Sequence, residues 1–283
     1  MAKVTAYYYS KDGTKMSNTS INNKRIAKNT LFLYLRMGLV LVVSLFTTRV
    51  VLQALGVEDY GINNVVSGFV TMFAFLNTSM SNGVQRFYNF SLGKKNEYSI
   101  TDVYNTALQI QIILSVILLF LLETFGLWYI HTQMVIPDER FSAALWVFHF
   151  SVLSLVLLVL QIPYSAAIMA YERMDYYAYL SIFDVMAKLG IAYAIKYAAI
   201  DKLILYGALN MIVSLICFFL YYGYAKRQFH ELETDLKIRK EIFQPMLSFS
   251  GWNVFGSLAY MIKGHGLNML LNVFFGPVVN AAR

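Results

Sequence analysis

YNTALQIQIILSVILLFLLETFGLW, residues 104–128, is the segment from which the class of this protein follows most directly. It runs for 25 residues, and Glu123 is its only charged side chain. A transmembrane α-helix needs about 20 mostly apolar residues to cross a hydrocarbon core about 30 Å thick. In lipid, helices and closed barrels are the structures that satisfy every backbone hydrogen-bonding group. The segment therefore predicts a helix that spans a membrane.

Six further runs have the same length and apolar character. The seven predicted spans cover residues 31–54, 62–82, 104–128, 141–169, 178–199, 203–225 and 246–273. Hydrophobic residues make up 58% of the 283-residue chain and charged residues 14%, whereas soluble domains carry about 25% charged residues. One aqueous core cannot hold this excess of apolar surface, so lipid must solvate much of it. The sequence predicts an all-α, polytopic membrane helix bundle with about seven transmembrane helices.

The predicted spans divide the chain into four parts. These are a cytoplasmic N-terminal tail at 1–30, a first six-helix lobe at 31–225, a cytoplasmic linker at 226–245, and the first helix of a second lobe at 246–283. Pro163 lies near the end of the fourth span, where its missing backbone donor predicts a kink. The odd number of spans and the lack of a tail after them lead us to expect an N-terminal portion of a longer protein.

Lysine and arginine gather on one side of the predicted bundle. The tail and the second, fourth and sixth connections hold 15 of them, whereas the opposite connections hold only Arg140 and Lys202. Cytoplasmic loops of membrane proteins carry such an excess, so the N-terminus is predicted to be cytoplasmic. The net charge of +7 then reflects topology, and no nucleic-acid partner is expected.

Several charged side chains fall inside the predicted spans. The cations are Arg36, Arg49, Lys188, Lys196 and Lys263, and the anions are Asp184 and Glu123. An ionisable group at the bilayer centre costs about 2.5–3.5 kcal/mol on insertion scales, so each needs a reason. Because the interior is net positive, it suits an anionic ligand better than a cation.

Two interpretations stand for each of these cations. Arg36 and Arg49 lie near opposite ends of the first span, so they either reach the headgroups or face a cavity. Lys188 lies one turn after Asp184, which allows either a structural pair or a ligand site. Lys263 has no acidic residue within a turn. The candidate binding cations are Arg36, Arg49, Lys188 and Lys263, while Lys196 and Glu123 are expected to reach the headgroups.

The second span is unusually polar. Its candidate binding residues are Asn64, Ser67, Thr71, Thr78 and Asn82. Spacings of three, four and seven place most of them along one stripe of a helix. Small polar residues often serve helix–helix packing in membranes, which is one interpretation. The other is that they line a water-filled cavity and hydrogen-bond the hydroxyl groups of a sugar.

The sequence lacks the motifs of the common enzyme classes. Its four histidines are scattered without metal-ligand spacing, and its single cysteine, Cys217, excludes a cysteine-based metal site. There is no P-loop lysine, nucleophile elbow or dinucleotide fingerprint. We expect a protein that is not an enzyme and that uses neither a metal nor a cofactor.

Residues 49–62, RVVLQALGVEDYGI, combine an arginine, a Leu-Gly and a Tyr-Gly that leads into the polar second span. GVQRF follows at 83–87, and FFGPVVNAAR closes the chain at 274–283. In these features the chain resembles the N-terminal portion of bacterial polysaccharide (O-antigen type) flippases of the MATE-like exporter superfamily. The resemblance is diffuse and extends over most of residues 20–283.

The resemblance implies two six-helix lobes around a central cavity in the bacterial inner membrane. Alternating access would carry an undecaprenyl-pyrophosphate-linked oligosaccharide, an O-antigen or capsule repeat unit, to the outer leaflet. The implied partners are this lipid-linked oligosaccharide, membrane lipid, a coupling ion (H⁺ or Na⁺) and other polysaccharide-assembly proteins. In that setting Lys263, Arg36 and Arg49 are predicted to attract the pyrophosphate with support from Lys188, while the stripe of the second span faces the glycan.

Three other functions compete with this prediction. A cation-coupled drug or metabolite exporter of the same superfamily requires acidic residues deep in the first lobe, where only Asp184 qualifies. A membrane-embedded glycosyltransferase or polysaccharide polymerase requires a large outer loop or paired carboxylates at the membrane face, and neither is visible. A seven-helix receptor normally has its N-terminus outside, against the charge pattern.

Overall fold

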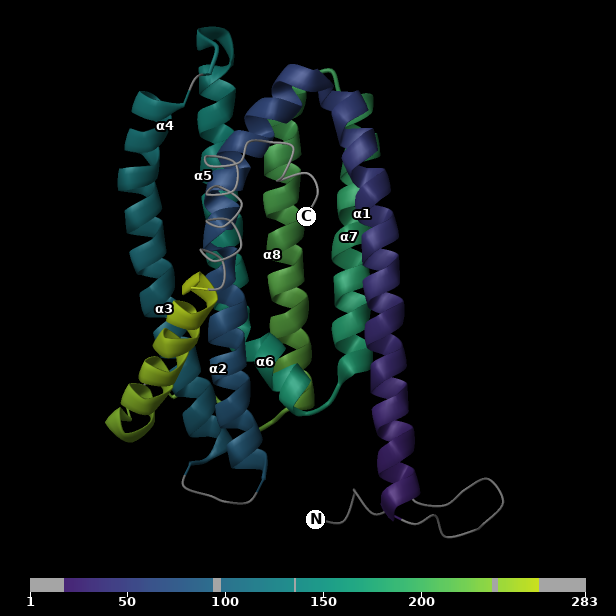
Figure 1. The fold of residues 1–283 in the computed structure, drawn as a ribbon, viewed down its shortest axis with the longest axis vertical. Helices are drawn as coiled ribbons and strands as arrows, with labels where there is room; N and C mark the ends of the chain where they lie inside the picture. Colours follow the sequence, from purple (N-terminus) through teal and green to yellow (C-terminus); the bar gives the residue numbers. More distant parts are fainter. Residues whose placement is uncertain (1–17, 94–97, 135, 236–238, 260–283) are drawn as a thin grey trace, which may run out of the picture.

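The computed structural model describes residues 18–93, 98–134, 136–235 and 239–259, and the regular secondary structure of these residues is entirely helical. Figure 1 shows long helices standing side by side, with a shorter helix leaning across the lower part. Five segments are long and apolar enough to cross a membrane: Ile26–Leu92, Ile100–Gln133, Asp138–Ala170, Met174–Lys196 and Lys202–Gln228. This confirms the predicted all-helical, multi-pass membrane bundle.

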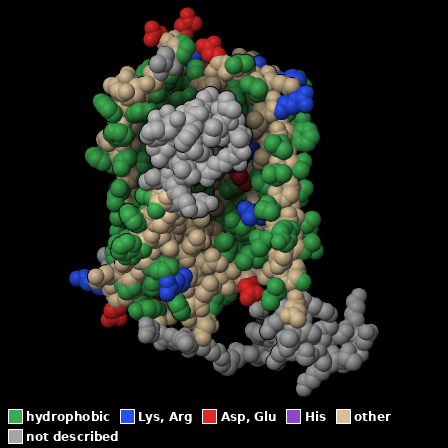
Figure 2. Space-filling view, in the orientation of Figure 1, with side chains coloured by type: hydrophobic (Ala, Val, Ile, Leu, Met, Phe, Trp, Pro, Cys, Tyr) green, Lys and Arg blue, Asp and Glu red, His purple; other side chains and the backbone are tan. Residues whose placement is uncertain are grey.

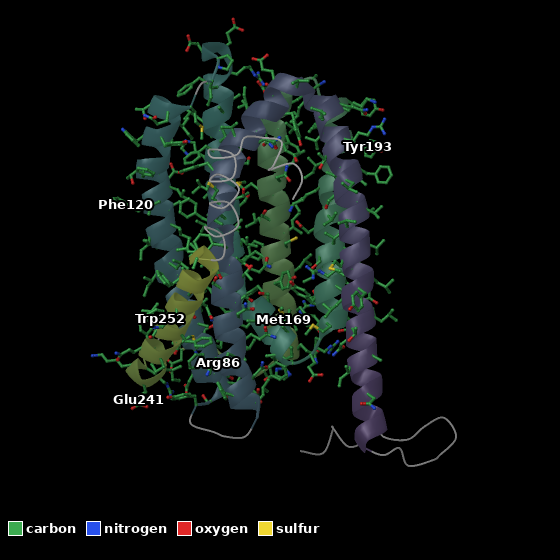
Figure 3. All side chains as sticks on the ribbon, viewed as in Figure 1. Arg86, Phe120, Met169, Tyr193, Glu241 and Trp252 are labelled. Atoms are coloured by element: carbon green, nitrogen blue, oxygen red, sulfur yellow. The ribbon has the colours of Figure 1, made fainter. Side chains whose placement is uncertain are left out.

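The outer surface has the distribution expected of a protein in lipid. Hydrophobic side chains are spread over the parts of the face in Figure 2 that are not grey, and most of the charged side chains gather toward its upper and lower ends. Phe120 and Tyr193, labelled in Figure 3, are among the large apolar side chains that remain exposed. In water such a surface would be unfavourable, whereas acyl chains solvate it without cost.

The first segment folds back on itself at a glycine. Helix α1 (Asn18–Thr71) begins within the predicted tail and runs through the first predicted span. At Gly56 the backbone adopts φ 83° and ψ 172°, a conformation that is open almost only to glycine. The chain turns over at the upper end of the bundle and descends into α2 (Phe75–Leu92), as Figure 1 shows. The first two predicted spans are therefore one kinked helical segment.

The remaining helices match the third to sixth predicted spans closely. They are α3 (Ile100–Leu121), a π-helical turn η3 (Leu122–Gly126), α4 (Leu127–Gln133), α5 (Asp138–Leu160), α6 (Ile162–Ala170), α7 (Met174–Lys196) and α8 (Lys202–Gln228). The α-helix is interrupted near the predicted kink, because α5 ends at Leu160 and Pro163 lies in the first turn of α6. In the first turn of a helix a backbone N–H has no acceptor within the helix, so proline costs no hydrogen bond there.

Residues 240–259 form a helix that packs on α2 through small side chains. This is the described part of the seventh predicted span, whose remainder lies outside the described residues. Ser79 Oγ of α2 donates a hydrogen bond to Ser257 Oγ at 2.7 Å. One turn further along α2, Gly83 lies against the fully buried Ser250. Small residues at such a contact allow two helix backbones to approach closely.

We expect Gly83→Leu to weaken this packing. A Cβ atom at residue 83 would lie 2.2 Å from Ser250 Oγ and 3.4 Å from Ser250 Cα, so the partner helix would have to move. Overpacking of this kind costs about 1–3 kcal/mol. Thermal unfolding of the protein in detergent should show a lower melting temperature. Gly251→Leu is the matched control because a Cβ there meets nothing within 4 Å, and an equal loss in both variants would contradict the prediction.

Candidate functional site

A cavity of about 540 Å³ lies inside the bundle. It is bounded by α1 on both sides of its kink, by α2, and by α5 to α8, and Met169 of α6 marks its lower part in Figure 3. Many of the side chains that line it are polar and uncharged, namely Asn63, Ser67, Thr71, Asn77, Ser81, Ser151, Ser154, Gln161, Ser165, Ser181, Asn210 and Ser214. A hollow of this size and polarity within membrane-spanning helices can hold a polar ligand.

Three charged residues line the same cavity: Arg36 of α1, with Asp184 and Lys188 of α7. Figure 2 shows blue and red side chains within the hollow of this face of the bundle. Lys188 Nζ donates to Asp184 Oδ2 at 2.8 Å, which confirms that the two residues pair across one helical turn. Since this pair is neutral as a unit, Arg36 leaves the cavity with one net positive charge.

Arg36 is the cation of the cavity without a carboxylate partner among the described residues. Its guanidinium lies over the ring of Tyr177, 4.6 Å from the ring centroid, so the side chain is fixed by a cation–π contact. Its Nε is buried and makes no hydrogen bond to the part of the chain that the structure describes. A buried donor without an acceptor is costly, and an anion in the cavity would satisfy it.

The serines of the wall are held by their own helices. Ser151, Ser181 and Ser214 each donate to the backbone carbonyl four residues earlier. Ser67 Oγ lies 3.2 Å from both Asn63 Oδ1 and Ser151 Oγ, which joins α1 to α5 across the cavity. Each hydroxyl oxygen keeps acceptor capacity beyond these bonds. The wall can therefore receive hydrogen bonds from ligand hydroxyls without rearranging.

The structure divides the predicted polar stripe. Ser67 and Thr71 line the cavity as expected, but Asn64, Thr78 and Asn82 do not, and Asn63, Asn77 and Ser81 take their places. All three displaced residues are exposed on other faces. Asn77 also donates to the carbonyl oxygen of Leu158 on α5 at 3.0 Å.

For Thr78 and Asn82 the cause of this shift is a 3₁₀ turn, η2 (Met72–Ala74), between α1 and α2. Asn64 precedes the turn and lies about 100° around α1 from Asn63, which lines the cavity. A 3₁₀ residue rotates the chain by about 120° instead of the 100° of an α-helix, so three of them add about 60°. This rotation brings Asn77, rather than Thr78, onto the face that carries Ser67. The predicted stripe assumed one uninterrupted α-helix, and the side chains beyond the turn were therefore placed one residue out of phase.

The other predicted cations are not brought into this cavity. Arg49 is exposed and does not contribute to the lining, although it lies on the same helix as Arg36. Lys263 lies outside the described residues. Glu123 Oε1 lies 3.0 Å from His149 Nδ1 on α5, and the prediction that Glu123 reaches the headgroups stays a prediction. Among the described residues, no three His, Cys, Asp or Glu side chains come together in a way that could hold a metal ion.

A second charged cluster, which was not predicted from the sequence, joins three helices at the upper end of the bundle. Arg140 of α5 bonds both carboxylate oxygens of Asp59 at 2.8 and 2.6 Å, and it bonds Asp201 at 2.6 Å. Asp201 also caps α8 by accepting from the backbone of Leu203 and Ile204. The position of Asp201 directly before an apolar run is an N-cap signal that the sequence offers.

These contacts set the ionisation of Asp201. Burial raises its pKa, but the hydrogen bond from Arg140 and those from the backbone of α8 outweigh burial, and the net pKa lies below the ordinary value. The carboxylate is therefore charged at neutral pH. Asp59 lies three residues after the Gly56 kink, so the same contact holds the turned segment of α1 against α5 and α8.

No protein-family model matches this chain, and the comparisons with curated proteins and with solved structures found no significant similarity. The resemblance to polysaccharide flippases thus remains a prediction from the residues quoted above.

Proposed function

We propose that this chain forms the first lobe of a flippase for an undecaprenyl-pyrophosphate-linked oligosaccharide. The protein would span the bacterial inner membrane with a cytoplasmic N-terminus and seven spans within this chain, and it would work by alternating access between two lobes. The observation that carries the proposal is the polar cavity inside apolar helices, where the buried Nε of Arg36 has no acceptor among the residues that the structure describes. Such a cavity suits a substrate that combines an anion with many hydroxyls.

The cavity offers separate environments for the two polar parts of this substrate. The pyrophosphate would bind at Arg36, whose planar guanidinium matches phosphate oxygens, and near Lys188. The sugar units would hydrogen-bond the hydroxyl and amide groups of α1, α2 and α5, such as Ser67, Asn77 and Ser154. The polyprenyl tail would stay among the acyl chains, which avoids the cost of moving it through water.

The positions of the basic connections support the proposed orientation. The C-terminal end of α2 and the turn between α6 and α7, which contains Arg173, lie at the lower end in Figure 1, as does the start of α1. The Arg140 cluster lies at the opposite end, where its charge is neutralised by two aspartates. With the lower end in the cytoplasm, the excess of lysine and arginine obeys the positive-inside rule.

A cation-coupled exporter of the same superfamily fits this cavity less well. Such an exporter needs a carboxylate that can take up a proton or Na⁺, and Asp184 is the acidic residue of the described lining. Its Oδ2 is already bonded to Lys188. The lining therefore favours an anionic ligand over a cationic one.

The test is a flipping assay with the complete protein in proteoliposomes that contain a fluorescent polyprenyl-pyrophosphate oligosaccharide. We expect the glycan of the inner leaflet to become accessible to an added lectin or glycosidase only when the protein is present. A cationic dye in the same vesicles should not move. Dye export without glycan movement would support the exporter, and movement of neither would contradict both functions.

A further inference from the structure

Helix α2 has a second polar face that does not belong to the cavity. Asn82, Gln85, Arg86 and Asn89 form it together with the exposed ring of Phe90, and these residues line a groove of about 470 Å³. Asn82 and Asn89 are two helical turns apart and share one side of the helix. Ser81 points into the cavity described above, about 100° around α2 from Asn82. The two polar faces are therefore distinct.

The polar groups of this groove are not used by the fold. None of the side chains of Asn82, Gln85, Arg86 and Asn89 makes a hydrogen bond or an ion pair with a residue in the described part of the chain. The opposite side of α2 packs in the core through Val84 and Tyr88, so α2 does not need the side-chain amides of the groove to pack against the bundle. These four groups need polar neighbours, and at the cytoplasmic end of α2 water, lipid headgroups or a polar ligand can supply them.

Arg86 is held in place by aromatic rings. Its guanidinium lies 4.1 Å from the ring centroid of Phe249 on helix 240–259 and 5.3 Å from that of Phe90. Figure 3 shows Arg86 at the lower part of α2, beside that helix. Stacking fixes the plane of the guanidinium and leaves its N–H groups free to donate in that plane. The donors are therefore oriented before any ligand arrives.

From this combination we infer that the groove is a carbohydrate subsite at the cytoplasmic end of α2, which binds sugar units of the lipid-linked oligosaccharide. The inference rests on the proposed function and deepens it. Carboxamides both donate and accept, as sugar hydroxyls do, so three of them can bind a sugar whichever way its hydroxyls point. The exposed face of Phe90 can pack against the C–H face of a sugar ring, and Arg86 can bind a hydroxyl or the carboxylate of an acidic sugar.

Binding of lipid-free glycans tests this site separately from transport. The probes are an N-acetylglucosamine trisaccharide and a tetrasaccharide that contains glucuronic acid, followed by saturation-transfer NMR with the purified chain in nanodiscs. We expect at least one probe to bind the wild type, and its affinity to fall at least tenfold in Asn82→Ala/Asn89→Ala and in Arg86→Gln. Gln133→Ala removes an exposed carboxamide at the end of α4 and should bind the probe as the wild type does. Melting temperatures verify that each variant is folded.

The probes lack pyrophosphate, so failure of this inference and failure of the proposed function can be told apart. A protein that flips the lipid-linked substrate but binds neither probe, or binds a probe equally well in the α2 variants, overturns the subsite and leaves the transport function standing. Thiol labelling adds an independent measurement in a Cys217→Ser background. Asn89→Cys should react with a membrane-impermeant maleimide, whereas Phe120→Cys on the apolar surface should not. An unreactive Asn89→Cys would also overturn the inference, because a sugar needs a wet groove.

Discussion

Arg36→Gln is expected to weaken binding of a polyprenyl pyrophosphate about 10- to 100-fold. The guanidinium is fixed over Tyr177, and its buried Nε has no acceptor in the described residues, so an anion there gains a charge-assisted hydrogen bond without displacing a protein partner. Such a bond contributes about 1.5–3 kcal/mol, and each 1.4 kcal/mol is about tenfold in affinity. Titration of the protein in detergent with farnesyl pyrophosphate measures the dissociation constant directly.

Two comparisons make this result specific. Arg36→Lys keeps the charge but loses both the planar fork and the stacking on Tyr177, so we expect an intermediate loss. Arg49→Gln removes the other arginine of the same helix, which is exposed and outside the cavity lining, and it should bind as the wild type does. The sequence alone assigned both arginines to the pyrophosphate. An equal loss in the two glutamine variants would favour that assignment and contradict the role given to the cavity.

Arg140→Ala is expected to lower the free energy of unfolding by about 2–3 kcal/mol. The substitution leaves Asp59 and Asp201 as two neighbouring carboxylates without their shared cation, and it releases the segment after the Gly56 kink from α5 and α8. Removing one partner of a buried ion pair costs about 3–5 kcal/mol. The loss here should be smaller, because the three side chains are 18–32% exposed. Thermal or denaturant unfolding in detergent measures it.

A matched arginine tests whether position matters more than charge. Arg173 pairs with Asp175 at a longer distance of 3.4 Å and is more exposed, so Arg173→Ala should cost less than about 1 kcal/mol. In the double variant Arg140→Ala/Asp59→Asn one of the two uncompensated charges is gone, and part of the stability should return. Equal losses for the two arginines would contradict the proposed clamp.

The Arg140 contact should also depend on pH in a defined direction. The pKa of Asp201 is lowered in the folded protein, so its contribution to stability is complete above the ordinary aspartate pKa of about 3.9 and is lost as the pH falls through the folded value. The difference in melting temperature between wild type and Arg140→Ala should stay constant from about pH 7 to pH 5. It should shrink below about pH 4. A difference that shrinks already between pH 7 and pH 5 would indicate another titrating group.

The helical membrane bundle could be predicted because its cause is local. Segments such as 104–128 and 203–225 are long and apolar enough that lipid and backbone hydrogen bonding leave a helix as the available structure. The helix boundary before Pro163 and the pairing of Asp184 with Lys188 are local in the same sense, because they depend on residues at most one turn apart. For these features the order of residues along the chain carries the information.

The candidate site depended on geometry that no single segment contains. The phase of α2 was set by the 3₁₀ turn at 72–74, which moved Asn77 into the cavity and Thr78 and Asn82 out of it. Arg140 forms ion pairs with Asp59 and Asp201, which are 81 and 61 residues away in the sequence. Residue spacing predicts which side chains share a helix face only while the helix is uninterrupted. Which charged side chains pair over long sequence distances depends on how the helices pack. Apolar length therefore specified the helices, whereas rotation and packing specified which of their polar groups meet.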